Sequence, residues 1–258
     1  MGRCWAEVLG GCDAMSGEHV FSNAIFKAGC GCPTVIEGVQ RIRNGAPTRN
    51  AEKANILCRH HNSLLSPLDE FAGKLASFQA SCSDENFNET PLVEGEVFER
   101  WALKTVINVA VAGWAGSRKW RPAPEIVASI FGEAKIPQEQ GLGLHSVDGM
   151  DPNHHPSGGT SFFPVVMNKP GDPQLAGAYI AVHGMPLFVS FHHDLVRRLE
   201  GGELPNLSQR FSSDGLKHLY HPGAIVITRK RGQSLVIGLS WNGLLRYADG
   251  TTTPFPLS

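Results

Sequence analysis

Apolar and polar residues follow one pattern before about residue 142 and another pattern after it. In the earlier part, a segment that starts at Ser66 repeats apolar residues every three or four positions, which is the spacing of one helix face. Ser66 is suited to be the N-cap and Pro67 the first helical residue, and Asp69 is placed to reach back to the cap. The predicted face consists of Leu68, Phe71, Leu75 and Phe78. We expect this helix to pack against the residues that precede it.

Two more helices are predicted before the pattern changes. One runs over about residues 95–111, and a shorter one begins at Pro124 and ends at Gly132. The apolar stripe of the longer helix contains Phe98, Trp101, Ala102, Thr105 and Val109. Residues 1–62 show little helical periodicity, and their glycine and proline turn signals flank short strands such as 34–36.

After residue 142, short runs rich in β-branched and aromatic residues alternate with turn signals, which is typical of strands. The predicted strands cover residues 161–167, 178–182, 187–191, 224–228 and 234–239, and the last two form a hairpin. Five or more such strands favour an antiparallel sandwich or a small barrel. The pattern therefore predicts an α+β fold in three parts. These are an N-terminal domain (1–80), a helical connector (81–135) and an antiparallel β domain of unassigned role (136–258).

Composition narrows the class of protein. The chain has 258 residues and a formal net charge of −1, so a nucleic-acid partner would need a local basic patch. The longest apolar stretch, 106–115, is interrupted by Asn108 and Gly113 and is too short to span a bilayer. The N-terminus has no secretory pattern. We expect a cytoplasmic protein without a membrane partner, and the sequence indicates no particular oligomeric state.

All six cysteines lie before residue 83, close to histidines, which favours metal binding in a reducing compartment over a disulfide framework. Structural zinc takes four nitrogen or sulfur ligands, commonly from two close pairs. Cys58-x-x-His61 has the spacing of one pair. Cys4 and Cys12 are the preferred second pair, while Cys30-x-Cys32 is an alternative source of ligands. The other interpretation is a set of free buried cysteines.

A second group of residues gives the N-terminal part a family resemblance. Glu18-His19 is followed, some forty positions later, by Asn55 and by Asn62, which belongs to the phrase Leu57-Cys58-x-x-His61-Asn62-Ser63. This arrangement resembles the HNH endonuclease family, in a variant where His61 replaces the second cysteine of a CxxC-N phrase. The resemblance covers roughly residues 1–75. It implies a ββα-metal finger braced by structural Zn²⁺, and hydrolysis of phosphodiester bonds in nucleic acid, with DNA as the expected substrate.

The resemblance also implies a role for each residue. Glu18 and Asn62 would hold Mg²⁺ or another divalent ion, His19 would be the general base, and Asn55 would orient the base from a loop. These residue types suit the chemistry, because imidazole titrates near neutral pH and hard divalent ions prefer oxygen ligands. On a strand, Glu18 and His19 point in opposite directions, so Glu18 would reach the ion only through local twist.

The segment 41–59 carries an excess of basic residues over a single acidic one, Glu52. Such residues could contact phosphates, which supply most sequence-independent affinity for nucleic acid. An ordinary solvated loop would have the same composition. The candidate nucleic-acid contacts are Arg41, Arg43, Arg49, Lys53 and Arg59.

Two other functions are compatible with the sequence. The finger could be a non-catalytic zinc module that binds nucleic acid or protein, or an unassigned activity could reside in the β domain. The nuclease hypothesis requires Glu18, His19 and Asn62 to converge. No dinucleotide, P-loop, esterase or common metalloprotease motif occurs in the chain.

Overall fold

The structure is a computed structural model that describes part of the chain at residue level. The described residues are 3–28, 34–37, 47–48, 53–81, 91–115, 120–136, 141–146, 160–169, 172–182, 185–191, 217–221, 223–228, 234–242, 244–246 and 252–254.

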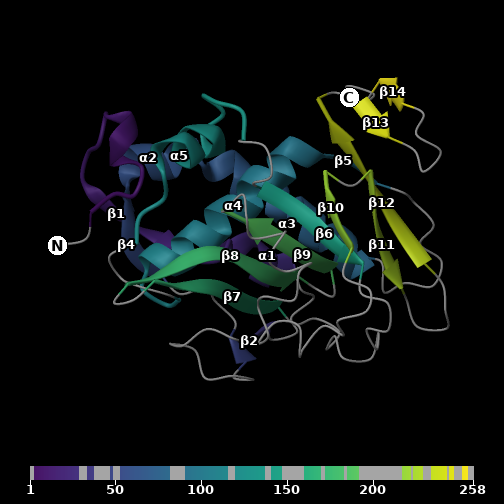
Figure 1. Cartoon of the computed structure of the whole chain (residues 1–258), viewed down its shortest axis with the longest axis horizontal. Helices are drawn as coiled ribbons and strands as arrows, with labels where there is room; N and C mark the ends of the chain where they lie inside the picture. Colours follow the sequence, from purple (N-terminus) through teal and green to yellow (C-terminus); the bar gives the residue numbers. More distant parts are fainter. Residues whose placement is uncertain are drawn as a thin grey trace.

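Of the N-terminal elements, β1, β4 and α2 lie on the left side of the molecule in Figure 1, and α1 and α3 lie nearer its centre. Strand β1 pairs antiparallel with β4, and helix α2 follows β4 directly, so the order is strand, strand, helix. We call β1, β4 and α2 the finger. The elements of this part are the 3-10 helix η1 (Glu7–Leu9), β1 (Met15–His19), α1 (Asn23–Ala28), β4 (Lys53–Cys58), α2 (Arg59–Leu64) and α3 (Ser66–Ser81).

Helix α4 (Gly95–Val111) crosses the centre of the molecule (Figure 1). Every residue from Trp101 to Ala110 is buried, because α3 and α5 (Pro124–Ile130) pack on it together with strands of both larger sheets. The predicted positions of α3, α4 and α5 are confirmed. All five residues of the expected apolar stripe are buried, and the buried surface is wider than that stripe, because every residue from Trp101 to Ala110 lies inside the protein.

The remaining strands form two sheets. The seven-stranded sheet has the order β10-β6-β9-β8-β7-β2-β3, and the five-stranded sheet has the order β11-β12-β13-β14 with β5 beside β12. Their bounds are β2 (Thr34–Glu37), β3 (Pro47–Thr48), β5 (Leu92–Glu94), β6 (Gly141–Ser146), β7 (Thr160–Lys169), β8 (Asp172–Val182), β9 (Met185–Ser190), β10 (Lys217–Tyr220), β11 (Ala224–Thr228), β12 (Ser234–Trp241), β13 (Leu244–Arg246) and β14 (Thr252–Pro254).

The predicted strands after residue 142 are confirmed, and the pairs among them are antiparallel. Two strands from earlier in the chain join these sheets in parallel: β2 pairs with β7, and β5 pairs with β12. The fold is therefore mixed helix and sheet with antiparallel sheets, as expected, and the sheets are not built from the C-terminal part alone.

One hydrophobic core connects the parts of the chain. It extends from Cys4 through Trp101 to Trp241 and includes residues on both sides of positions 80 and 135. The division into three domains stays a prediction, while the core itself crosses the proposed boundaries. None of the helices that the structure describes is long and apolar enough to cross a membrane.

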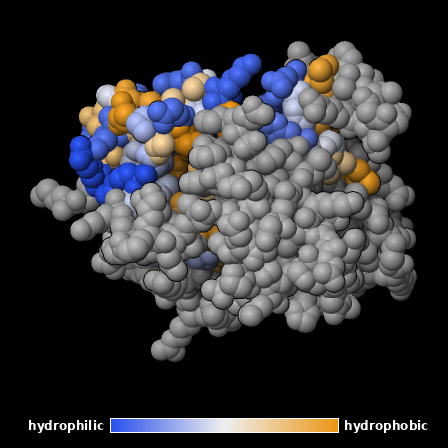
Figure 2. Space-filling model, in the orientation of Figure 1, coloured by the Kyte–Doolittle hydropathy of each residue, from blue (hydrophilic) through white to orange (hydrophobic). Residues whose placement is uncertain are grey.

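The described surface mixes apolar and polar residues. Over the N-terminal part, orange and blue side chains alternate on the face shown in Figure 2. Single exposed apolar residues are normal on soluble proteins and define no interface. Within the described ranges, the exposed large apolar residues are Val8, Leu64, Leu92, Val236 and Leu244.

Candidate metal centre

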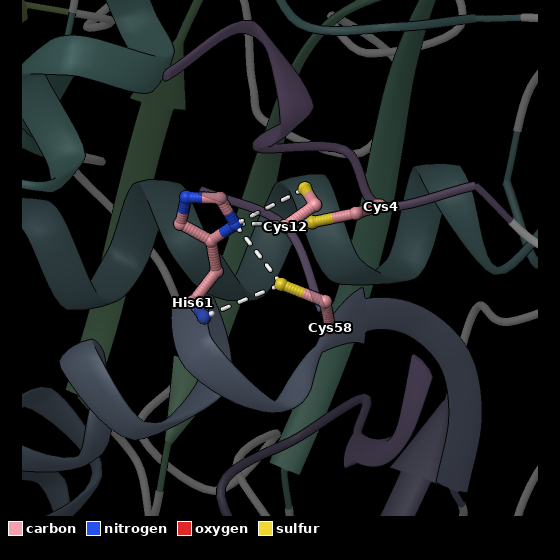
Figure 3. Close-up of side chains that lie close together, drawn as sticks. All are labelled: Cys4, Cys12, Cys58 and His61. Carbon is pink, nitrogen blue, oxygen red and sulfur yellow. Dashed lines mark hydrogen bonds between the residues drawn. The ribbon is translucent and has the colours of Figure 1, made fainter. Parts of the chain in front are cut away.

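Four side chains from three segments point toward one another at the end of the finger (Figure 3). These are Cys4, Cys12, Cys58 and His61, whose ligand atoms all lie within 4.8 Å of one another. The Nδ1 atom of His61 is 3.4 Å from the sulfur of Cys4, 3.6 Å from that of Cys12 and 3.1 Å from that of Cys58. The four residues preferred from the sequence spacing are therefore brought together.

Backbone contacts explain why these segments meet. The N–H of Trp5 donates to the carbonyl of Ile56, which places Cys4 beside β4. The N–H of Arg59 donates to the carbonyl of Ala14, which holds the segment after Cys12. Between the two cysteines, Gly10 and Gly11 have φ values of 77° and 65°, a conformation that glycine adopts without steric penalty. These two glycines let the chain turn back so that Cys12 reaches Cys4.

Cys58 also caps helix α2. It ends β4 and is the N-cap of α2, where its sulfur accepts a hydrogen bond from the N–H of His61 at 3.4 Å. The His61 ring also packs against Phe131, which follows α5, with ring centroids 5.4 Å apart. The cluster thus lies where the finger meets the helical core.

The nitrogen–sulfur distances of the cluster are close to those around a tetrahedral zinc ion. With Zn–S of about 2.3 Å and Zn–N of about 2.0–2.1 Å, a nitrogen and a sulfur ligand lie about 3.6 Å apart and two sulfurs about 3.8 Å apart. The Nδ1–S distances of 3.1–3.6 Å come close to this arrangement. Four protein ligands would fill the coordination sphere, and no position would remain for a substrate or water, which is the property of a structural site.

The three thiols have different electrostatic environments. Burial raises the pKa of Cys4, although the N–H groups of Cys58 and Ala6 oppose the shift. Cys12 is exposed as a residue, but loss of hydration around its sulfur, together with the neighbouring thiols, raises its pKa to about 12. Burial also acts to raise the pKa of Cys58, but hydrogen bonds from the N–H groups of His61 and Asp13 outweigh it, so this pKa is lowered. Cys58 is therefore the thiol that these contacts favour as a thiolate.

The pKa of His61 is lowered, first by burial and then by the adjacent His60. A neutral imidazole is the form that binds metal. His60 itself is exposed, and its backbone N–H donates to Asp13 at 3.0 Å. Of the two adjacent histidines, only His61 belongs to the cluster.

Glu18 lies inside the protein, only 3% exposed. Its Oε1 atom is 2.9 Å from Nζ of Lys104, and Nδ2 of Asn108 donates to the same oxygen at 3.3 Å. Burial raises the pKa of this carboxyl, while the charge of Lys104 opposes the shift. The carboxylate is therefore occupied by two side chains of α4.

His19 is the last residue of β1, opposite Lys53, the first residue of β4. Its side chain is half-buried, and Lys53 is exposed. The pKa of His19 is lowered, mainly by burial and then by the charge of Lys53. The neutral imidazole, which can accept a proton, is the form that this environment favours at neutral pH.

The two asparagines of the expected site occupy different elements. Asn55 lies within β4 and is exposed, so its expected position in a loop is wrong. Asn62 lies on α2, directly after His61, and is half-buried. In the part of the chain that the structure describes, the cysteine–histidine cluster is the one group of at least three Cys, His, Asp or Glu ligands.

The candidate nucleic-acid contacts are described only in part. Arg41, Arg43 and Arg49 lie outside the described residues, as do the alternative zinc ligands Cys30 and Cys32. Lys53 and Arg59 are both exposed, and Nε of Arg59 lies 3.9 Å from a carboxylate oxygen of Asp13.

The resemblance implies two metal ions, zinc and a divalent ion at Glu18, and the residues present suit only the first. The cysteine–histidine cluster has the donors that zinc binds, and its ligand atoms all lie within 4.8 Å of one another. The Glu18 carboxylate does not suit a divalent ion in this arrangement, because the ammonium of Lys104 lies against the oxygen that would bind it.

Three residues around Glu18 were not identified from the sequence. Lys104 and Asn108 lie four positions apart in the mostly apolar C-terminal half of α4, which was the available signal of a buried polar face. Asp69 was expected to cap α3. In the structure its carboxylate accepts hydrogen bonds from Ser22 and from Lys104. A comparison of the chain with protein-family models, with curated proteins and with solved structures found no match.

Proposed function

We propose that the chain is an HNH-type phosphodiesterase that acts on nucleic acid, with DNA as the expected substrate. The observation that carries the proposal is the place of His19 at the end of β1, at the opposite end of the β1–β4 pair from Cys58. There its imidazole is half-buried, has a lowered pKa and lies opposite the exposed Lys53 on the neighbouring strand. A proton acceptor beside a cation is the combination that hydrolysis of a phosphodiester requires.

In this proposal the cluster of Cys4, Cys12, Cys58 and His61 holds structural zinc. Bound zinc would supply no catalytic step, since four protein ligands complete its sphere. The ion would join the N-terminal segment to the start of α2. It would thereby hold strand β1, which ends at His19, in a fixed orientation. Binding energy of such an ion contributes directly to folding.

The proposed reaction uses groups of the chain and one water molecule. His19 accepts a proton from the water as the water oxygen bonds to phosphorus. The bond from phosphorus to the leaving oxygen breaks, and that oxygen takes a proton from solvent. His19 then returns its proton to solvent. The exposed ammonium of Lys53 would offset negative charge on the phosphate.

A second candidate function is the non-catalytic binding module. One specific observation favours it: the ion pair with Lys104 engages the carboxylate that HNH enzymes are expected to give to a metal. In that case the zinc-braced finger would present Lys53 and Arg59 to a partner without turnover.

Plasmid nicking by the zinc-loaded chain tests the proposal. Wild type, His19→Ala and the matched control His60→Ala are incubated with supercoiled DNA, with and without added Mg²⁺ or Mn²⁺. Nicking that persists in His60→Ala and falls at least a hundredfold in His19→Ala supports the proposal. DNA that is bound but never cut by wild type supports the binding module. Equal nicking by both histidine variants contradicts the role of His19.

A further inference from the structure

Helix α4 presents a buried polar stripe to the finger. Trp101, Lys104 and Asn108 lie three and four positions apart, and each is only 1% exposed. Nε1 of Trp101 donates to Oγ of Ser22 at 2.9 Å, and Nδ2 of Asn108 donates to the backbone carbonyl of His19 at 3.3 Å. The stripe therefore holds the strand end that carries His19.

Lys104 is the centre of this stripe. Its ammonium lies 2.7 Å from Oδ2 of Asp69, on α3, and 2.9 Å from Oε1 of Glu18, on β1. Asp69 also accepts from Ser22, and Glu18 also accepts from Asn108. One buried cation thus connects two carboxylates from separate elements, which is the arrangement that a bridging metal ion has in other proteins.

We propose that Lys104 is the permanent cation of this site, in the place that the HNH resemblance gives to a divalent ion, and that Glu18 binds no such ion. Lys104 is a positioning residue, because its ammonium contacts Glu18 and Asp69 and lies too deep to reach a substrate. The inference rests on the proposed function only in taking the surroundings of His19 as the active site.

Two features of the site exclude an added ion. Mg²⁺ requires about six oxygens at about 2.0–2.1 Å in octahedral geometry, and a cation this close to Glu18 would be repelled by the ammonium. Displacement would also leave Lys104 charged and buried without its partners, which strongly disfavours the displaced state. The carboxylates therefore keep their ammonium in solutions that contain divalent ions.

The inference is tested by Mn²⁺ binding, which is measured as the loss of the EPR signal of free Mn²⁺. This test needs no measurement of activity. The zinc-loaded full chain is titrated with Mn²⁺ as wild type, Glu18→Gln, Lys104→Ala and the double variant. Wild type and Glu18→Gln are expected to bind the same amount of Mn²⁺, because Glu18 holds no ion in the wild type. Lys104→Ala is expected to bind about one equivalent, and the double variant is expected to lose it.

Two results of the Mn²⁺ titration would overturn the inference. A Mn²⁺ ion that wild type binds and Glu18→Gln loses would overturn the inference, and this arm remains valid if Lys104→Ala does not fold. A folded Lys104→Ala chain that binds no Mn²⁺ would also overturn it, since the ammonium would then not occupy an ion site. A chain that never cuts nucleic acid would refute the proposed function and leave these binding results as they are.

Discussion

Nε1 of Trp5 donates a hydrogen bond of 3.0 Å to Oδ1 of Asn108, across 103 positions of sequence. Both side chains are buried, and Nδ2 of the same asparagine donates to Glu18 and to the carbonyl of His19. Asn108 therefore connects the segment that carries Cys4 with the strand end that carries His19. The metal centre and the proposed base are held to the same helix.

Trp5→Phe should destabilise the protein more than the same change at Trp114. Both tryptophans are buried, but Nε1 of Trp114 has no hydrogen-bond partner among the described residues. Loss of the Trp5 donor leaves Oδ1 of Asn108 buried and unpaired, which costs about 1–3 kcal/mol. Urea unfolding of the two variants measures the difference. Equal losses would show that the hydrogen bond contributes nothing net.

His61→Ala should remove the bound metal, while His60→Ala should keep it. The two histidines are adjacent, yet only His61 directs a nitrogen into the cluster. Elemental analysis of protein purified without added metal should give about one zinc per chain for wild type and His60→Ala, and little for His61→Ala. Thermal unfolding with a chelator should lower the midpoint of wild type and leave that of His61→Ala unchanged. Zinc retained by His61→Ala would contradict the ligand set.

Cys58→Ala should destabilise the protein more than Cys12→Ala, although each removes one sulfur ligand. Cys58 is buried and caps α2, and Cys12 is exposed. Loss of the cap adds about 0.5–2 kcal/mol to the loss of the ligand. Unfolding free energies measured with excess zinc compare the two variants. A Cys12→Ala chain that is the less stable one would show that the cap is unimportant.

Gly95→Ala should lower the stability by about 1–3 kcal/mol through overpacking. A methyl group there would lie 2.6 Å from the carbonyl oxygen of Ser240 and 2.7 Å from the ring of Trp241. Gly17→Ala is the control, because the nearest atom to its methyl would be the flexible side chain of Lys53 at 3.4 Å. Chemical denaturation of both variants measures the effect. A neutral Gly95→Ala would mean that α4 and β12 can move apart without loss.

Stability should fall as the pH is lowered through about 6.5, partly because of His19. Burial and the charge of Lys53 lower its pKa in the folded state, so the unfolded chain binds more protons in this range. His19→Gln should therefore lose less stability than wild type between pH 7.5 and 5.5, with urea unfolding as the measurement. The contribution of zinc is common to both chains. Identical pH slopes would show that His19 has an ordinary pKa.

The sequence predicts some features of this fold well because the signals are local. Pro124 and the apolar run after it fix the start of α5, and the Cys58-x-x-His61 spacing fixes one pair of cluster residues. Lys104 shows the limit of this approach. Periodicity assigns a lysine to the solvent side of a helix, and only the packing of other elements around α4 makes that side an interior one.

The contacts of Asp69, like the burial of Lys104, depend on the packing of distant elements. Three residues after Ser66, its carboxyl group suits a helix cap, and the sequence offers no sign of its distant partners Ser22 and Lys104. Competition between a local hydrogen bond and a charged partner from another helix is decided by tertiary structure. The ionic centre beside the finger could therefore not be predicted, whereas the cysteine–histidine cluster could.

Strand β5 has a consequence for the order in which the protein forms. It precedes α4 directly, but its partner β12 is made much later, and the nearby contact of Glu96 with the N–H of Asn242 spans 146 positions. During synthesis, α4 emerges from the ribosome well before β12 exists to cover its N-terminal end. Contacts of such long range form slowly. We therefore expect completion of the five-stranded sheet to be a late event in folding.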